Sequence, residues 1–161
     1  MKSVAQAVVV LPDIRSAHNV GSIFRTCDAA GIDKVYLAGY TPDPLDRFGR
    51  PVKEIAKTAL GAEKTIPWEH EGDVLKLLAK LKKEGFVVVA IELTENSADY
   101  KTIAVAPDAK VAFVFGNEVD GVSAEVLERC DVVAHIPMGG EKESLNVSVA
   151  AGIALFRILG I

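Results

Sequence analysis

The chain has 161 residues and a mass of 17.1 kDa, which is the usual length of a single domain. Half of the residues are apolar and a quarter are charged, so the chain can bury a core and is not a disordered segment. No apolar run reaches the roughly 18 residues of a membrane span, and residues 1–3 lack a signal-peptide layout. Two distant cysteines, Cys27 and Cys130, are typical of a reducing compartment, and we expect a cytoplasmic protein.

The net charge of −4 is unevenly distributed along the chain. Residues 15–64 hold eight basic side chains against six acidic ones, whereas residues 65–161 hold nine against fifteen. An anionic partner is therefore expected to prefer the first third of the chain.

Short β-branched runs alternate with segments of helical periodicity along the whole chain. In chain order, the pattern predicts a strand at 7–11, a helix at 19–30 that ends at Gly31, a strand at 34–38, a loop at 41–49, a short helix at 52–60, a helix between its cap Asp73 and Gly85, strands at 86–91, 111–115 and 132–136, and a helix at 147–159.

Two of the predicted strands, 86–91 and 111–115, are continuously apolar, which is typical of strands covered on both faces. The sequence therefore predicts an α/β domain, with a mainly parallel sheet and helices on both faces. Ligands of such sheets bind at the carboxyl ends of strands, here after Leu11, Ile91, Phe115 and Ile136. The last helix is apolar nearly all round, so we expect it in the core or against a second subunit.

The common nucleotide-binding motifs are missing. The segment 116–123 has the glycine spacing of a phosphate-binding loop, but Val122 stands where the lysine is required. His18, His70 and His135 have no metal-ligand spacing, and we expect no metal site. An α/β enzyme that acts on a small nucleotide is therefore a disfavoured alternative.

A first polar segment, residues 19–25, opens the first predicted helix, where free N–H groups favour an anion. Arg25 is surrounded in sequence by Ile23, Phe24 and Cys27. Burying its guanidinium among such side chains would cost free energy unless an anion pairs with it. The alternative is a structural ion pair with Asp28 or another carboxylate.

A second polar segment, residues 115–121, follows a buried strand. Gly116 would let a ligand approach the backbone closely, and Glu118 places a carboxylate at the ligand edge of the sheet. The alternative is a plain turn that caps the next helix through Ser123.

A third polar segment, residues 136–148, contains a flexible glycine-rich loop after Pro137. Either Ser144 or Asn146 is expected to cap the last helix. The loop is longer than the roughly two to six residues that a plain connection needs.

Together, these segments carry a family resemblance. The motifs N-V-G-S-I-F-R (19–25), K-T-A-L-G-A-E (57–63), F-G-N-E-V-D-G (115–121) and I-P-M-G-G-E-K-E-S-L-N-V-S-V-A (136–150) stand in this order. The chain resembles, over essentially its whole length, the SpoU branch (also called the TrmH type) of the SPOUT RNA 2′-O-ribose methyltransferases.

The resemblance implies a SPOUT-type fold, whose C-terminal third forms a deep trefoil knot. It also implies S-adenosylmethionine (AdoMet) as methyl donor, held in the knot by backbone groups, and an obligate homodimer with each active site at the interface. The implied substrate is RNA, with tRNA favoured and rRNA possible. We expect residues 1–161 to be one methyltransferase domain without an added RNA-binding domain.

Carried over residue by residue, the family's motifs assign two sets of site residues. The resemblance implies catalytic roles for Asn19, Arg25, Glu118, Ser144 and Asn146. It implies AdoMet contacts for Leu93, Gly116, Ile136, Ser144, Leu145 and Asn146.

We hypothesise that Arg25 pairs with an RNA phosphate and stabilises the alkoxide that develops on the ribose. Asn19 and Asn146 would position the ribose and the RNA backbone. Glu118 would fix Arg25 or its own loop, or contact the substrate, and the sequence leaves these options open.

For RNA binding, the sequence offers Arg15, Arg47, Arg50 and Lys53, with Phe48 between the basic residues. Phe48 either stacks on a base or is tucked inward. Glu141 and Glu143 stand beside the predicted site and would repel RNA. A non-catalytic RNA- or partner-binding dimer is the alternative function, disfavoured because all five catalytic positions are occupied by the family's polar residues.

Overall fold

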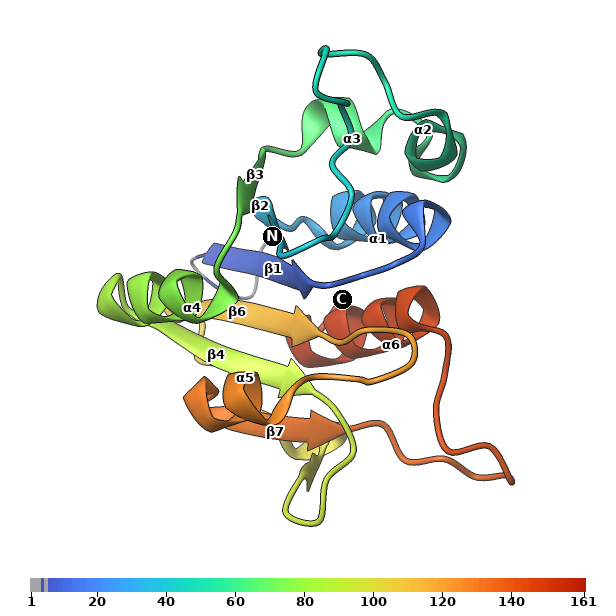
Figure 1. Ribbon diagram of the computed structural model, residues 1–161. Coiled ribbons are helices and arrows are strands. Elements are labelled where there is room, and N and C mark those ends of the chain that lie inside the picture. Colours follow the sequence, from blue (N-terminus) through green and yellow to red (C-terminus); the bar gives the residue numbers. More distant parts are fainter. Residues whose placement is uncertain (1–3, 5) are drawn as a thin grey trace.

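The continuous apolar runs form the inner strands of a parallel sheet at the centre of the molecule. The computed structural model describes residue 4 and residues 6–161, and the sheet in this part of the chain has seven strands (Figure 1). Its strands are β1 (Gln6–Pro12), β2 (Lys34–Ala38), β3 (Trp68–Glu71), β4 (Phe86–Ile91), β5 (Ala98–Asp99), β6 (Lys110–Phe115) and β7 (Val132–His135). Their order across the sheet is β3-β2-β1-β6-β4-β7-β5, and every neighbouring pair is parallel.

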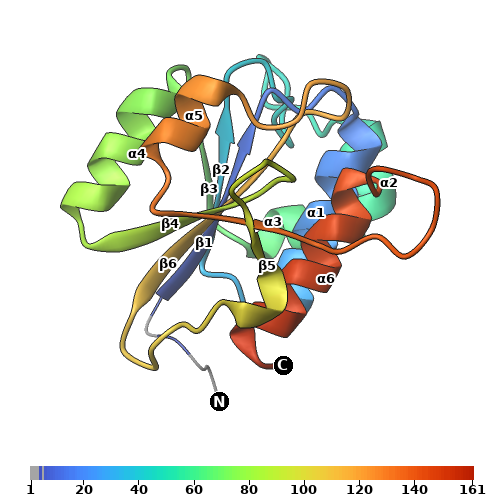
Figure 2. The ribbon, with the colours of Figure 1, turned by 90° about the horizontal axis from the view of Figure 1, so that it is seen from below.

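Helices cover both faces of this sheet, as the sequence predicted (Figure 2). One face packs against α1 (Ala17–Ala30), α2 (Lys53–Ala59), α3 (Ala62–Thr65) and α6 (Val147–Leu159), and the other against α4 (Val74–Lys83) and α5 (Ala124–Arg129). The side chains of β1 alternate between the two faces of the sheet, and both faces are buried. Val9 and Leu11 pack on the face covered by α1 and α6, and Val8 and Val10 on the face covered by α4 and α5, which explains why the strand is apolar throughout. A short 3₁₀ helix, η1 (Tyr100–Thr102), lies between β5 and β6.

The ends of the helices follow the capping residues of the sequence. Gly31 ends α1 in the left-handed conformation, and Asp73 caps α4 by accepting hydrogen bonds from two backbone N–H groups. Asn146, and not Ser144, caps α6. Helix α1 begins at Ala17, earlier than the predicted Asn19, because the Ser16 side chain accepts from the Asn19 N–H.

Several short elements escaped prediction. Strand β3 has the sequence W-E-H-E and pairs only with β2 at the edge of the sheet, so it lacks the apolar signal of a buried strand. Strand β5 has only two residues, and α3 only four. Among the described residues no helix is long and apolar enough to cross a membrane. The trefoil knot implied by the resemblance stays a prediction.

The parallel arrangement brings the carboxyl ends of β1, β4, β6 and β7 to one edge of the sheet (Figure 1). After β7 the chain crosses this edge in a long loop and enters α6, which packs beside α1. The predicted polar segments therefore meet at one edge, because each follows a strand or begins one of these two helices.

Helix α1 packs closely against α2 because residue 21 has no side chain. A Cβ atom at Gly21 would lie 2.0 Å from Thr58 Oγ1 and 2.3 Å from the Ile55 carbonyl oxygen. Thr58 Oγ1 also donates a 2.8 Å hydrogen bond to the His18 carbonyl, so the two helices are tied as well as packed. This contact fixes the position of α1, the helix that carries Asn19 and Arg25.

Replacing Gly21 with alanine should therefore lower the free energy of unfolding by about 1–3 kcal/mol, the usual cost of overpacking. Gly152 in α6 is a matched control, because a Cβ there would meet only Thr26 Cγ2 at an ordinary 3.7 Å. Gly152→Ala should be neutral or stabilising by roughly 0.5–1 kcal/mol, since alanine favours helix. Urea unfolding of both variants tests this, and equal effects would contradict it.

Candidate active site

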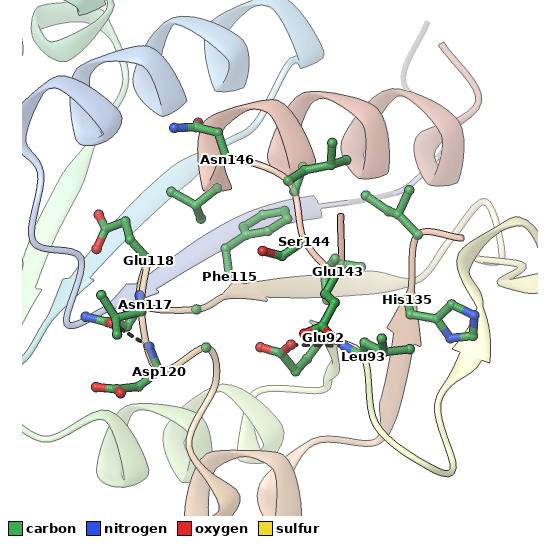
Figure 3. A pocket seen from close by; sticks show the side chains of 18 of the residues that line it. Glu92, Leu93, Phe115, Asn117, Glu118, Asp120, His135, Glu143, Ser144 and Asn146 are labelled. Carbon is green, nitrogen blue, oxygen red and sulfur yellow. Dashed lines mark hydrogen bonds between the residues drawn. The ribbon is translucent and has the colours of Figure 1, made fainter. Parts of the chain in front are cut away.

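A pocket of about 470 Å³ opens at the carboxyl edge of the sheet (Figure 3). Its walls are the ends of β4, β6 and β7, the loop 116–121, and residues 143–147 where α6 begins. Glu143 and Ser144 project into it between Phe115 and Glu92 (Figure 3). The structure brings all of the predicted AdoMet-contacting residues to this pocket: Leu93, Gly116, Ile136, Ser144, Leu145 and Asn146.

The pocket is acidic. Glu92, Glu118, Asp120 and Glu143 line it, and no lysine or arginine of residue 4 and residues 6–161 is among its lining residues. The remaining wall is largely apolar, with the aromatic ring of Phe115 and aliphatic side chains such as Leu93. Such a cavity favours a ligand that combines an apolar surface with positive charge, and it disfavours a nucleotide phosphate.

Glu118 is bound by the start of α1. Its Oε1 accepts hydrogen bonds from the backbone N–H groups of Arg15 and Ser16, both at 3.1 Å, and its Oε2 accepts from Arg15 N–H at 3.0 Å. The Asn19 Nδ2 donates to Oε1 at 3.3 Å. The anion that the sequence predicted near this helix start is thus a carboxylate of the chain itself.

Asn19 and Asn146 extend this contact to the last helix. Asn146 Nδ2 donates to Asn19 Oδ1 at 3.2 Å, while its own Oδ1 caps α6 by accepting from the Ser148 and Val149 N–H groups. All donors point the same way, from the start of α6 through both amides to the Glu118 carboxylate. We call Glu118, Asn19 and Asn146 the amide relay. Each of its bonds polarises the next.

Hydrogen bonds from the start of α1 lower the pKa of Glu118. Burial raises the pKa of this carboxyl, but the hydrogen bonds from Arg15, Ser16 and Asn19 outweigh burial. The pKa of Glu118 consequently lies below its ordinary value of 4.5. Of the roles considered for this residue, the structure supports holding a loop. The contacts of its carboxylate are with the β1–α1 loop and Asn19 and do not include Arg25.

Two residues that the sequence interpretation missed hold the pocket's loops. Asn117 is buried, and its Oδ1 accepts from the Val119 and Asp120 N–H groups. Its Nδ2 donates to the Asp13 carbonyl at 2.7 Å and to Tyr40 Oη at 2.8 Å. The sequence signal that could have identified Asn117 was an amide side chain next to Glu118 in a tight turn, where asparagine commonly hydrogen-bonds the nearby backbone.

Glu92 is the second missed residue. It directly follows β4, and its carboxylate accepts from the Leu93 N–H at 3.0 Å and from the Val122 N–H at 2.8 Å. It thereby joins the loops after β4 and β6 across the pocket. A carboxylate immediately after a buried strand was the signal that could have identified it.

Gly116 lines the pocket and also closes the loop that follows β6. A Cβ atom there would lie 2.4 Å from both the Gly121 carbonyl carbon and the Val122 nitrogen. The glycine is required because two ends of one loop approach each other, and the turn is closed by backbone bonds between Asn117 and Gly121. Ser123 caps α5 as the alternative interpretation expected, so this segment is both a capped turn and a pocket wall.

Arg25 stands apart from the pocket. Its side chain is exposed, which corrects the expectation that burial would make its charge expensive. Within the described residues it has no ion pair with Asp28 or any other carboxylate. Six helical positions separate it from Asn19, which places the two side chains roughly 120° apart around α1. One chain therefore brings together four of the five predicted catalytic residues and leaves Arg25 facing outward.

The predicted RNA-binding residues lie on the α1–α2 side of the molecule. Arg15 has an exposed side chain, and its backbone contacts Glu118 at the pocket edge. Arg47 and Arg50 flank an exposed Phe48 in the connection before α2, and Lys53 is the first residue of α2. Phe48 is thus not tucked inward.

Comparison with known proteins gives the family. The sequence profile of the SpoU rRNA Methylase family matches residues 6–156, so the chain belongs to this family. A protein of Staphylococcus haemolyticus assigned to the TrmH family of tRNA/rRNA methyltransferases is 35% identical over 151 residues, which are 94% of this chain and 57% of that protein.

Solved structures of related proteins have the same fold as this chain. An AdoMet-bound rRNA methyltransferase from Sinorhizobium meliloti superposes with a TM-score of 0.85 at 32% identity, over 96% of this chain and 56% of that one. A TrmH/SpoU tRNA modifying enzyme from A. aeolicus superposes with a TM-score of 0.82 at 30% identity, over 96% of this chain and 74% of that one. The chain spans a little over half the length of the Staphylococcus and Sinorhizobium proteins.

Replacing Glu118 with glutamine tests the relay through its pH dependence. Because the pKa of Glu118 is lowered in the folded state, the ionised carboxylate stabilises the fold above pH 4.5. This contribution is lost as the pH falls through the lowered pKa. The difference in urea midpoint between the wild type and Glu118→Gln should therefore be largest near neutral pH and shrink in acid. A difference independent of pH would contradict the assignment.

Proposed function

We propose that this chain is an AdoMet-dependent RNA 2′-O-ribose methyltransferase that works as a homodimer in the cytoplasm. One observation carries the proposal: an acidic pocket lined by four carboxylates lies at the carboxyl edge of the sheet, bordered by the Asn19–Glu118–Asn146 relay. Membership of the SpoU family supports the reaction class.

The pocket fits AdoMet in size and charge. Its volume of about 470 Å³ lies within the range of roughly 300–1,000 Å³ for small-ligand sites. Leu93, Ile136 and Leu145 offer apolar contacts for an adenine ring, and the carboxylates of Glu92 and Glu143 suit a sulfonium and an ammonium group. The same carboxylates disfavour ATP and NAD, whose phosphates they would repel.

The outward direction of Arg25 supports a site shared between two copies. Helix α6 begins at the pocket and exposes Val149 and Ile153 on its outer face, with 49% and 37% of their surface accessible. A second copy seated on this apolar face would lie at the pocket mouth. In that arrangement Arg25 of one copy serves the pocket of the other, which explains why the chain alone leaves the guanidinium unpaired.

In the reaction, AdoMet supplies a methyl group that its sulfonium already activates. The chain has to orient the ribose and stabilise the charge on its 2′-oxygen. Arg25 pairs with an RNA phosphate and stabilises the developing alkoxide, because its guanidinium stays charged at working pH. The proton of the 2′-hydroxyl passes to that phosphate or to water, since a charged guanidinium cannot accept it. Asn146 and Asn19 hold the ribose at the pocket mouth. Glu118 acts as a positioning residue that orients both amides.

The substrate proposed is tRNA, with rRNA as the alternative. The relatives named above include one tRNA modifying enzyme and one rRNA methyltransferase, so both classes of RNA occur among them. In either case the substrate is a polyanion that must approach an acidic pocket. Basic residues from α1 and the connection before α2 have to hold it there.

Transfer of labelled methyl from AdoMet into size-fractionated bacterial RNA tests the reaction. The wild type should label the tRNA or rRNA fraction. The phosphodiester bond next to the labelled nucleotide should resist alkaline cleavage, because that cleavage needs a free 2′-hydroxyl. Arg25→Ala should lose at least 10²-fold in rate, since a donor aimed at the developing oxyanion is worth about that much. Arg25→Lys should also be impaired, because a lysine cannot form a bidentate pair.

Thermal unfolding is the control for this assay. AdoMet should raise the melting temperature of the wild type and of Arg25→Ala alike, while ATP and NAD should not. Stabilisation without methyl transfer to any RNA would favour the non-catalytic binding dimer. If AdoMet neither stabilises the protein nor donates a methyl group to any RNA, the methyltransferase proposal is overturned.

A further inference from the structure

The connection between β2 and α2 contains a tight turn built around one carboxylate. We define the Asp46 turn as residues 45–51, closed by an antiparallel bridge between Leu45 and Pro51. Asp46 Oδ1 accepts from the Phe48 N–H at 2.8 Å and from the Arg50 N–H at 3.0 Å. The Asp46 backbone adds bonds to the Arg50 carbonyl at 2.8 Å and from the Gly49 N–H at 2.9 Å. The turn is therefore a fixed structure, although it lies at the surface.

The turn presents an aromatic ring with two guanidinium groups to solvent. Phe48 is 65% exposed, and the guanidinium carbons of Arg47 and Arg50 lie 4.7 and 4.9 Å from its ring centroid. Asp46 Oδ2 accepts from Arg50 Nε at 3.0 Å and so holds Arg50 in this place. Arg47 contacts no carboxylate among the described residues, so its charge is available to an anion.

A ring exposed in this way does not contribute to the core, because it buries little apolar surface. Aromatic rings and guanidinium planes are the groups on which splayed-out RNA bases stack, and a nearby free arginine suits the adjacent phosphate. Bases within a duplex remain stacked on each other and cannot reach such a ring. The chemistry of the turn therefore fits an unpaired nucleotide.

The turn is also on the side of the molecule where the proposed function needs RNA. It leads directly into α2 at Lys53, and α2 packs on α1, the helix that carries Arg25 (Figure 1). The pocket, in contrast, is lined by acidic residues and repels a polyanion. An RNA strand held near Arg25 is thus expected to continue over the α1–α2 side.

We propose that the Asp46 turn docks an unpaired nucleotide of the RNA substrate, whose base stacks on the Phe48–arginine group while Arg47 pairs with the neighbouring phosphate. This inference rests on the proposed function and identifies the part of the substrate that the surface recognises. Asp46 is a positioning residue in it, because its carboxylate fixes both the turn and Arg50.

Fluorescence anisotropy tests the proposal, with a fluorescein-labelled single-stranded RNA of mixed sequence and the same strand in a duplex as probes. Phe48→Leu should weaken binding of the single strand by about tenfold, within the range of one base stack. Phe48→Tyr should retain binding, since it keeps the ring. Binding of the duplex should change little in both variants.

Arginine variants separate the phosphate contact from general charge. Arg47→Ala should reduce the slope of log affinity against log salt by about 0.7, the contribution of one phosphate contact on a single strand. Arg129→Ala removes an exposed arginine from α5 on the other face of the sheet and should leave the slope unchanged. Melting temperatures of all variants should match the wild type, because these side chains are exposed.

Two results would overturn the proposal: equal single-strand affinity in Phe48→Leu and the wild type, or equal losses on single strand and duplex. The methyl-transfer assay separates this failure from failure of the proposed function. If the wild type methylates RNA and Phe48→Leu has an unchanged KM, the docking surface is wrong and the function stands. If no methyl is transferred while single-strand binding still depends on Phe48, the reaction is wrong and the docking surface stands.

Discussion

The carboxylate of Glu118 is the contact on which the geometry of the site depends. It accepts hydrogen bonds from the backbone N–H groups of Arg15 and Ser16, directly before α1, and from the side-chain amide of Asn19. Through Asn146 the same chain of hydrogen bonds reaches the first turn of α6. The bonds to the Glu118 carboxylate are charge-assisted, and such bonds are stronger than neutral ones. The bond from Asn146 to Asn19 is neutral and joins residues 127 positions apart in the sequence. The sheet brings the segments that carry these residues to one edge, and the relay fixes them relative to one another.

Charge divides the molecule into two regions with different partners. The pocket carries four carboxylates and suits a cationic cofactor, whereas Arg25 and the Asp46 turn lie on the side with free basic groups and suit RNA. A single chain keeps these regions apart, because Arg25 lies on another face of α1 from Asn19. In the proposed dimer, joining the pocket of one copy to the Arg25 of another would bring the methyl donor and the ribose together without placing RNA phosphates against the acidic wall.

Much of the fold follows from local sequence. The strands β1, β4 and β6 were predictable because continuous β-branched runs have few other structures open to them, and Gly31, Asp73 and Asn146 marked helix ends by their chemistry. Strand β3 was not predictable, because its polar sequence is extended only through pairing with β2. The contact of Glu118 with the start of α1 spans about a hundred residues, and no local pattern reports it. The site residues themselves came from the motif resemblance, while Glu92 and Asn117 became visible only through their hydrogen bonds.

In the proposed dimer, each site combines the pocket of one copy with the Arg25 of another. Co-expression of Arg25→Ala and Leu145→Arg chains, each with its own tag, allows purification of mixed dimers that carry one defect on each copy. A shared site predicts that the mixed dimer regains about half of the wild-type methyl transfer, because one of its two sites is intact, while either variant alone is inactive. A mixed dimer as inactive as its parents would show that the pocket and Arg25 must belong to the same chain, and would contradict the account.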